Sequence, residues 1–228
     1  MINLIAHRGN DNHKYKENTK EAILECLKRD YIAGVEFDIR MTKDKKIVII
    51  HNSTIGHASD GWGFVKYMTL KQLRKYNFGS KEHVSKIATL EEVLKEIKSD
   101  KKIVIEIKND SSNYKTLVDK IVKISNKYPY INFYYCSFNH ELITYFKKKY
   151  PQFKIGIIYL FSPDYSKMIF FDFYTINYLF INQATMEREI MIWTVNDKDI
   201  YNKIIKKFKD YSKFDVDIIT DSANMLIK

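Results

Sequence analysis

Residues 34–51 read GVEFDIRMTKDKKIVIIH, and this stretch decides how the chain folds. The apolar, β-branched segments Gly34–Ile39 and Lys46–His51 are both typical of strands. Only residues 40–45 separate them, whereas a connection between parallel strands needs about a dozen residues or more. The two strands are therefore predicted to form an antiparallel hairpin that turns at Lys43–Lys46.

Outside this hairpin, short apolar runs alternate with helical patterns. Further strands are predicted at Ile2–Ala6, Ile103–Ile107, Ile131–Cys136, Lys154–Tyr159, Tyr174–Ile181, Ile190–Val195 and Asp217–Thr220, and helices at Lys20–Arg29, Tyr114–Ser125, Glu141–Lys149 and Asp199–Lys207. Alternating strands and helices indicate a parallel sheet, and eight strands remain when the second hairpin strand is set aside. We therefore predict one (β/α)₈ barrel domain over residues 1–228. An insertion after the second strand, at about 40–88, would end at the helix cap Thr89–Glu92.

Composition narrows the classes of protein. The net charge of +10 suits phosphate-bearing partners, but the lysines are scattered and no recognition-helix or zinc pattern accompanies them. We therefore expect no nucleic-acid partner, whereas contact with an anionic membrane and the oligomeric state stay open. There is no apolar run of about 18 residues and no charged leader before an apolar run. Neither a membrane span nor a signal peptide is predicted, and the cytoplasm is the expected location.

Three carboxylates are expected at the ends of adjacent barrel strands. Glu36 and Asp38 are two residues apart on one strand, so their side chains point to the same face. Glu106 ends the next barrel strand. A lone pair of acids is more often simply solvated, but three converging carboxylates repel one another unless a cation neutralises them. Oxygen ligands without a nearby cysteine favour one divalent cation, Ca²⁺ or Mg²⁺.

Two histidines are expected beside these carboxylates. His7 follows the first strand. If the hairpin turns between Asp44 and Lys45, Asp38 lies opposite His51. A lone histidine is usually structural, but two that converge with carboxylates are better explained as an acid/base pair.

Arg8 and Lys108, at the ends of the first and third barrel strands, would supply positive charge for a phosphate group. The hypothesis from these residues is therefore phosphate chemistry at a metal centre.

The chain resembles the glycerophosphodiester phosphodiesterase family from end to end. The matching pieces are AHRG at 6–9, ENT at 17–19, GVEFDIRMTKD at 34–44, His51, TLEEVL at 89–94, EIK at 106–108, SF at 137–138, WTVN at 193–196 and IITD at 218–221. Each piece alone is a weak signal, but together they occur in the family's order over the whole chain.

The resemblance implies a TIM barrel with a small insertion after its second strand. It also implies site residues: His7 and His51 as the catalytic pair, Glu36, Asp38 and Glu106 as metal ligands, Arg8 and Lys108 on phosphate, Trp193 lining the pocket, and Glu17, Asn52 and Asn196 supporting these residues from just outside them.

The sequence departs from the family at three places. Asn52 replaces the usual Asp after the second histidine and keeps the hydrogen-bonding side chain without its charge. Lys16 replaces the usual Pro before ENT, and residues 159–181 are unusually aromatic.

The expected activity is metal-dependent hydrolysis of a small glycerophosphodiester to glycerol 3-phosphate and an alcohol. A sister phosphodiesterase acting on lysophospholipid or a teichoic-acid-like polymer, and a catalytically silent barrel binding anionic lipid, are the alternatives.

Overall fold

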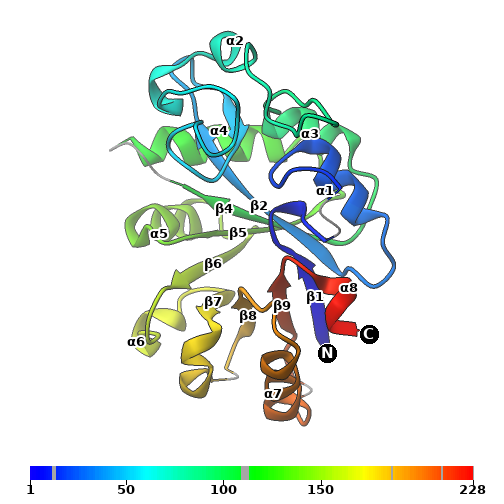
Figure 1. Ribbon diagram of the computed structural model, residues 1–228. Helices are drawn as coiled ribbons and strands as arrows, with labels where there is room; N and C mark the ends of the chain where they lie inside the picture. The colour runs from blue at the N-terminus through cyan, green and yellow to red at the C-terminus, as the bar shows by residue number, and fades with distance from the viewer. Residues whose placement is uncertain (12–13, 109–112, 186, 212, 228) are drawn as a thin grey trace.

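Parallel strands close into a barrel at the centre of the computed structural model, which describes residues 1–11, 14–108, 113–185, 187–211 and 213–227 (Figure 1). Within these ranges the barrel strands are β1 (Ile2–Ala6), β2 (Gly34–Met41), β4 (Lys102–Ile107), β5 (Asn132–Ser137), β6 (Lys154–Tyr159), β7 (Phe173–Asn177), β8 (Glu189–Trp193) and β9 (Val216–Thr220). They pair in the order β1-β9-β8-β7-β6-β5-β4-β2, and a β1–β2 pairing closes the ring. The predicted (β/α)₈ barrel is confirmed.

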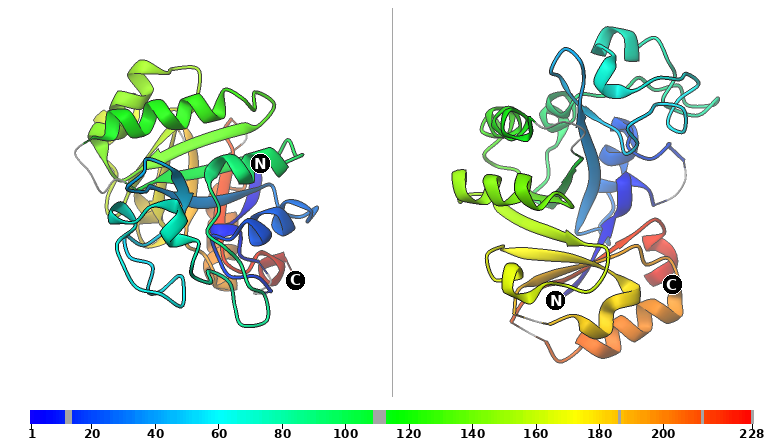
Figure 2. Two further views of the ribbon diagram at one scale, coloured as in Figure 1. Left: turned by 90° about the horizontal axis from the view of Figure 1, so that it is seen from above. Right: turned by 90° about the vertical axis from the view of Figure 1, so that its left-hand side faces the viewer.

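Helices lie on the outside of this barrel, as the views in Figure 2 show. They are α1 (Lys20–Leu27), α2 (Leu70–Leu73), α3 (Leu90–Glu96), α4 (Tyr114–Ser125), α5 (His140–Lys149), α6 (Tyr165–Met168), α7 (Lys198–Phe208) and α8 (Ala223–Ile227), with short 3₁₀ helices η1 (His7–Gly9), η2 (Val65–Tyr67) and η3 (Tyr178–Gln183). No helix in the described part of the chain is long and apolar enough to cross a bilayer.

Alternation along the strands sorts core residues from site residues. On β4, Ile103, Ile105 and Ile107 belong to the large core beneath the helices, while Val104 belongs to the smaller core inside the barrel. Side chains alternate between the two faces of a strand, so Glu106 points along the barrel interior with Val104. The same alternation on β2 directs its two acidic side chains inward.

The hairpin exists, but its register differs from the predicted one. Strand β3 (Ile47–Ile49) pairs antiparallel with β2, and Ile39 lies opposite Ile49. The Ile50 amide donates to the Asp38 carbonyl (2.9 Å), so Asp38 faces Ile50 rather than His51. Thr42 N–H bonds the Lys46 carbonyl at 2.9 Å, leaving a three-residue loop between them.

The loop geometry explains this shift. Lys45 adopts a positive φ of 63°, as the last residue of a three-residue hairpin loop does. The predicted two-residue turn was therefore wrong by one position.

One predicted strand was too long. Strand β7 ends at Asn177, and η3 replaces the predicted strand from Tyr178 to Ile181. The Asn177 side chain accepts a hydrogen bond from Leu179 N–H (3.0 Å), which favours a helical turn over continued pairing. The segment after β7 therefore packs against the large core outside the barrel, through Tyr178, Phe180 and Ile181.

Residues between β3 and α3 form an excursion with its own small core. Val48, Ile50, Ile55, Val65, Leu73, Phe78 and Ile87 are buried against one another there. The Thr89 side chain and that of Glu92 form the capping box that starts α3, where the chain returns to the barrel wall.

Candidate active site

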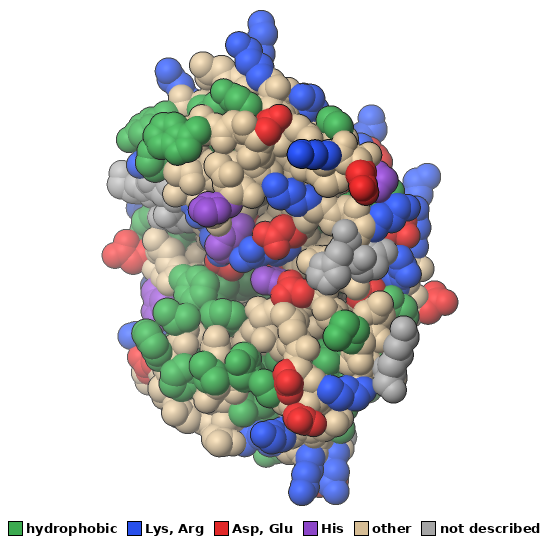
Figure 3. Space-filling model, viewed as in Figure 1, with side chains coloured by type: hydrophobic (Ala, Val, Ile, Leu, Met, Phe, Trp, Pro, Cys, Tyr) green, Lys and Arg blue, Asp and Glu red, His purple; other side chains and the backbone are tan. Residues whose placement is uncertain are grey.

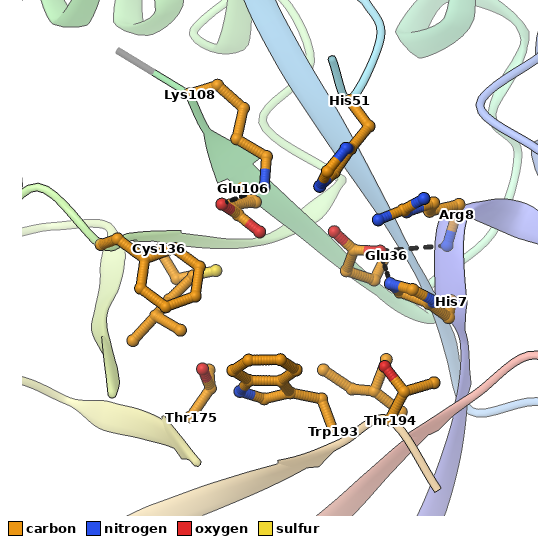
Figure 4. A pocket seen from close by; sticks show the side chains of 13 residues that line it. His7, Arg8, Glu36, His51, Glu106, Lys108, Cys136, Thr175, Trp193 and Thr194 are labelled. Carbon is orange, nitrogen blue, oxygen red and sulfur yellow. Dashed lines mark hydrogen bonds and ion pairs between the residues drawn. The ribbon is translucent and has the colours of Figure 1, made fainter. Parts of the chain in front are cut away.

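The site lies at the carboxyl ends of the barrel strands, where a (β/α)₈ barrel carries its reactive groups (Figure 4). One pocket there is lined by His7, Arg8, Glu36, His51, Glu106, Lys108, Cys136, Phe138, Ile158, Thr175, Trp193, Thr194 and Ile219. Asp38 is buried behind this wall, and Glu17 and Asn52 line an adjoining hollow. The residues that the sequence singled out are thus brought together by the closed barrel.

A tight turn after β1 sets the position of His7 and Arg8. Arg8 and Gly9 both have positive φ, of 54° and 67°. A Cβ atom on Gly9 would lie 2.8 Å from the backbone nitrogen of Ile23, so only glycine fits against α1. The turn aims the Arg8 N–H at Glu36 Oε2, 3.0 Å away.

Glu36, Asp38 and Glu106 form a compact group of acids. Their ligand oxygens lie within 4.8 Å of one another. Burial and the charge of Asp38 raise the pKa of Glu36 to about 8, and burial also raises the pKa of Glu106. The three carboxylates thus lack enough positive charge around them to ionise together. A divalent cation that binds oxygen ligands would supply this charge. These residues therefore fit the metal that the sequence predicts.

Two basic side chains reach into the same space. Lys108 Nζ lies 3.1 Å from Asp38 Oδ1 and also ion-pairs with Glu106. Arg8 Nη1 contacts Glu17 Oε1 at 2.8 Å, which leaves its Nε 3.5 Å from Asp38 Oδ2. Burial alone raises the pKa of Asp38, but Lys108, His51 and Arg8 outweigh it and lower this pKa. Asp38 therefore stays ionised beside two cations that can bind phosphate oxygens.

Asp221, the last residue of the IITD segment, holds His7 in place, a role that the sequence pattern did not predict. The His7 Nδ1–H donates to Asp221 Oδ1 at 2.8 Å, while Nε2 lies 3.9 Å from Glu36 Oε2. Burial alone lowers the pKa of His7, but the hydrogen bond and charge of Asp221 and the charge of Glu36 raise it overall. Asn196 Nδ2 in turn donates to Asp221 Oδ2 (2.7 Å), so a chain of contacts fixes the imidazole.

His51 is held by an amide instead. Its Nδ1 lies 2.5 Å from Asn52 Oδ1, which accepts a hydrogen bond from Nδ1–H and leaves Nε2 without the proton. Arg40 Nε donates to the His51 carbonyl (2.8 Å) and fixes the backbone at this point. Burial lowers the pKa of His51 and outweighs the opposing charge of Asp38.

Asn18 is a second residue whose contribution the sequence analysis missed. Its Nδ2 donates to Asp38 Oδ2 at 2.9 Å, and its Oδ1 accepts from the Asp38 N–H at 3.1 Å. A positive φ of 57° at Asn18 aims the side chain at β2. Asn18 and Asp221 both belong to segments that carry the family resemblance, and Asp221 directly follows β9.

The opposite half of the pocket is apolar. Trp193 and Phe138 meet edge to face with ring centroids 5.9 Å apart, and Ile158 and Ile219 complete the wall. Lys108 Nζ lies 5.8 Å from the centre of the Phe138 ring. The site thus offers charge on one side and flat apolar surface on the other.

A second acidic group in the described chain lies at the amino ends of the strands. Glu189, Asp215 and Asp217 could also approach a cation, but Lys102 Nζ already contacts all three, at 2.5, 3.2 and 2.7 Å. A residue of the protein therefore neutralises this group, in keeping with a stabilising role for that end of the barrel.

Known proteins share this sequence and architecture. The model of the glycerophosphoryl diester phosphodiesterase family matches residues 7–225. A glycerophosphodiester phosphodiesterase of Caldanaerobacter subterraneus subsp. tengcongensis is 31% identical over 242 residues, which cover 98% of this chain and 96% of the relative.

Solved structures agree with this likeness. A glycerophosphodiester phosphodiesterase of Thermotoga maritima is 25% identical with a TM-score of 0.73, over 100% of this chain and 97% of that one. A phosphodiesterase of Oleispira antarctica, solved with the product sn-glycerol-3-phosphate, shares the fold with a TM-score of 0.87 at 19% identity, over 99% and 95% of the two chains. The chain therefore belongs to the glycerophosphoryl diester phosphodiesterase family and is an enzyme of that class.

Proposed function

We propose that the enzyme hydrolyses small glycerophosphodiesters to glycerol 3-phosphate and an alcohol, with one divalent cation, Ca²⁺ or Mg²⁺, held by Glu36, Asp38 and Glu106. The observation that carries this proposal is the convergence of two differently partnered histidines on one group of buried acids. The product named for the Oleispira structure, sn-glycerol-3-phosphate, suits a pocket with a charged and an apolar half.

A bound cation would neutralise the three carboxylates and polarise a phosphate oxygen. Arg8 and Lys108 would hold the remaining phosphate oxygens, since both cations face the same space as the acids. Trp193 would place its flat ring against the carbon chain of the glycerol.

The hydrogen-bond partners of the two histidines indicate which proton transfer each would perform. A carboxylate partner stabilises the charged imidazolium, so His7, bonded to Asp221, would carry the proton and give it to the leaving alkoxide. An amide partner does not, so His51, bonded to Asn52, would stay neutral and take the proton from the attacking hydroxyl. That hydroxyl belongs to water or to the neighbouring glycerol, and a cyclic phosphate forms only in the second case.

The test is hydrolysis of a glycerophosphodiester with an alkyl leaving alcohol, with and without EDTA, because such an alkoxide must receive a proton as it leaves. A positioned acid or base contributes about 10²–10⁴-fold to the rate. His7→Ala and His51→Ala should each lose at least that order, with unfolding curves unchanged, and EDTA should abolish turnover of the unmodified enzyme. No turnover by the unmodified protein with Ca²⁺ or Mg²⁺ would support the silent, lipid-binding alternative. Turnover that survives EDTA and both histidine substitutions would refute the proposed metal and histidine roles.

A further inference from the structure

Two groups of exposed apolar side chains flank the mouth of the site. Figure 3 shows hydrophobic side chains gathered over the insertion on one side of the histidine-bearing hollow and over the α6–η3 region on the other. Exposed apolar side chains that gather in one patch often mark an interaction surface.

The first group, the insertion lip, consists of Trp62, Phe64 and Tyr67. These side chains are 73%, 38% and 65% exposed. Their rings form an edge-to-face row with centroids 5.9 and 6.0 Å apart, and Lys66 Nζ lies 5.0 Å from the Tyr67 ring. Val65 N–H donates to the Ser53 carbonyl (2.9 Å), which holds this row next to the residue that follows Asn52.

The second group, the β6–β7 lip, consists of Leu160, Phe161 and Leu179. They follow the carboxyl ends of β6 and β7 and are 49%, 65% and 70% exposed. The Phe161 ring meets Phe180 edge to face at 5.9 Å, which fixes this lip to η3.

One apolar residue of the pocket lies close in sequence to the β6–β7 lip, and another is itself exposed. Phe138, 41% exposed, touches Trp193 inside the pocket. Ile158 lines the pocket from β6, two residues before Leu160. The β6–β7 lip thus begins two residues after the apolar wall of the site.

The insertion beside the mouth is also basic. Residues 52–88 contain six lysines and arginines and two acids, in a chain with a net charge of +10. Aromatic rings with an apolar body, flanked by lysine, suit the interface between lipid headgroups and acyl chains. Anionic headgroups attract such a surface, by about 1 kcal/mol per basic residue close to the membrane.

We propose that the two lips dock the enzyme on an anionic phospholipid surface with the mouth of the site facing the lipid. A second copy of the chain fits this face less well, since it would oppose two basic insertions and cover both mouths. The proposal goes beyond hydrolysis and does not depend on it, because docking is measured without turnover.

The experiment is flotation of the full-length enzyme with vesicles of phosphatidylcholine alone or mixed with phosphatidylglycerol. We expect partition into the anionic vesicles that weakens as salt is raised. The double variants Trp62→Ala/Tyr67→Ala and Phe161→Ala/Leu179→Ala should each lose more than about tenfold in partition, since each removes two large apolar side chains.

Matched controls separate docking from other effects. Tyr130, also exposed (57%), precedes β5 at the opposite end of the barrel, so Tyr130→Ala should float like the unmodified enzyme. All these variants should hydrolyse bis(4-nitrophenyl) phosphate at the unmodified rate.

Three results would overturn the proposal. The unmodified enzyme could stay in the buffer fraction, or the lip variants could float as well as the unmodified enzyme. The third result is a stable dimer of the unmodified enzyme that the lip substitutions convert to monomers. Absence of hydrolysis with normal flotation would refute the proposed function and leave the docking surface standing.

Discussion

Asn18 allows a direct test of how the group of three acids is held in place. Its amide makes both a side-chain and a backbone hydrogen bond to Asp38, at 2.9 and 3.1 Å. Its own N–H bonds the Arg8 carbonyl at 2.8 Å, which ties the turn after β1 to the same point. Asn18→Ala removes both contacts with Asp38 and places an alanine at φ 57°.

The cost of this change follows from those contacts. A hydrogen bond to a charged group contributes about 1.5–3 kcal/mol, and a buried N–H left without a partner costs about 1–3 kcal/mol. A left-handed backbone conformation adds about 1 kcal/mol for alanine, a cost that glycine avoids. We therefore expect Asn18→Ala to lose about 4–7 kcal/mol of unfolding free energy and Asn18→Gly about 1 kcal/mol less.

Urea unfolding of the three proteins in EDTA measures these differences. Calorimetric titration with Ca²⁺ should show weaker binding in both variants, because Asp38 loses the bonds that orient its carboxylate. Unfolding midpoints and Ca²⁺ affinities equal to those of the unmodified enzyme would show that Asn18 does not position Asp38.

Three further predictions concern other residues of the site. Asp221→Asn should lower the pKa of His7, because the substitution removes a carboxylate that raises this pKa. The basic limb of the kcat/KM profile should then move to lower pH by about one unit. An unmoved limb would exclude His7 as the acid. Asn52→Asp should raise the pKa of His51 and move the acidic limb upward by less than one unit (~0.5), since the amide already orients the ring, and a larger shift would show that charge rather than orientation matters at this position. Glu36→Gln should weaken Ca²⁺ binding at least about tenfold. It should nevertheless raise the melting temperature in EDTA above pH 5, because burial raises the pKa of Glu36 and its ionised form destabilises the fold as pH rises. A lower melting temperature in EDTA would contradict the view that the acids repel one another.

The barrel was predictable because its evidence is local. Apolar runs mark the strands, and residues 40–45 are too few for a parallel crossover, which singled out the hairpin. The register of that hairpin was not predictable in the same way. It depends on the positive φ of Lys45 and on Thr42, whose backbone and side chain close the loop against Lys46.

The acids of the site were predictable from their positions near the ends of the strands. Glu36, Asp38 and Glu106 follow from alternation and topology, since the carboxyl ends of parallel strands meet at one mouth. The contact between His7 and Asp221 spans 214 positions and exists only because β1 pairs with β9 when the ring closes. The choice of a partner for each imidazole is therefore a tertiary property.

The most direct test of the proposed hydrolysis is ³¹P NMR of a glycerophosphodiester incubated with the enzyme in Ca²⁺ or Mg²⁺ and in EDTA. The proposed function requires conversion to glycerol 3-phosphate with the metal, and none in EDTA or with the His7→Ala and His51→Ala variants. Undiminished conversion in EDTA, or by either histidine variant, would contradict it.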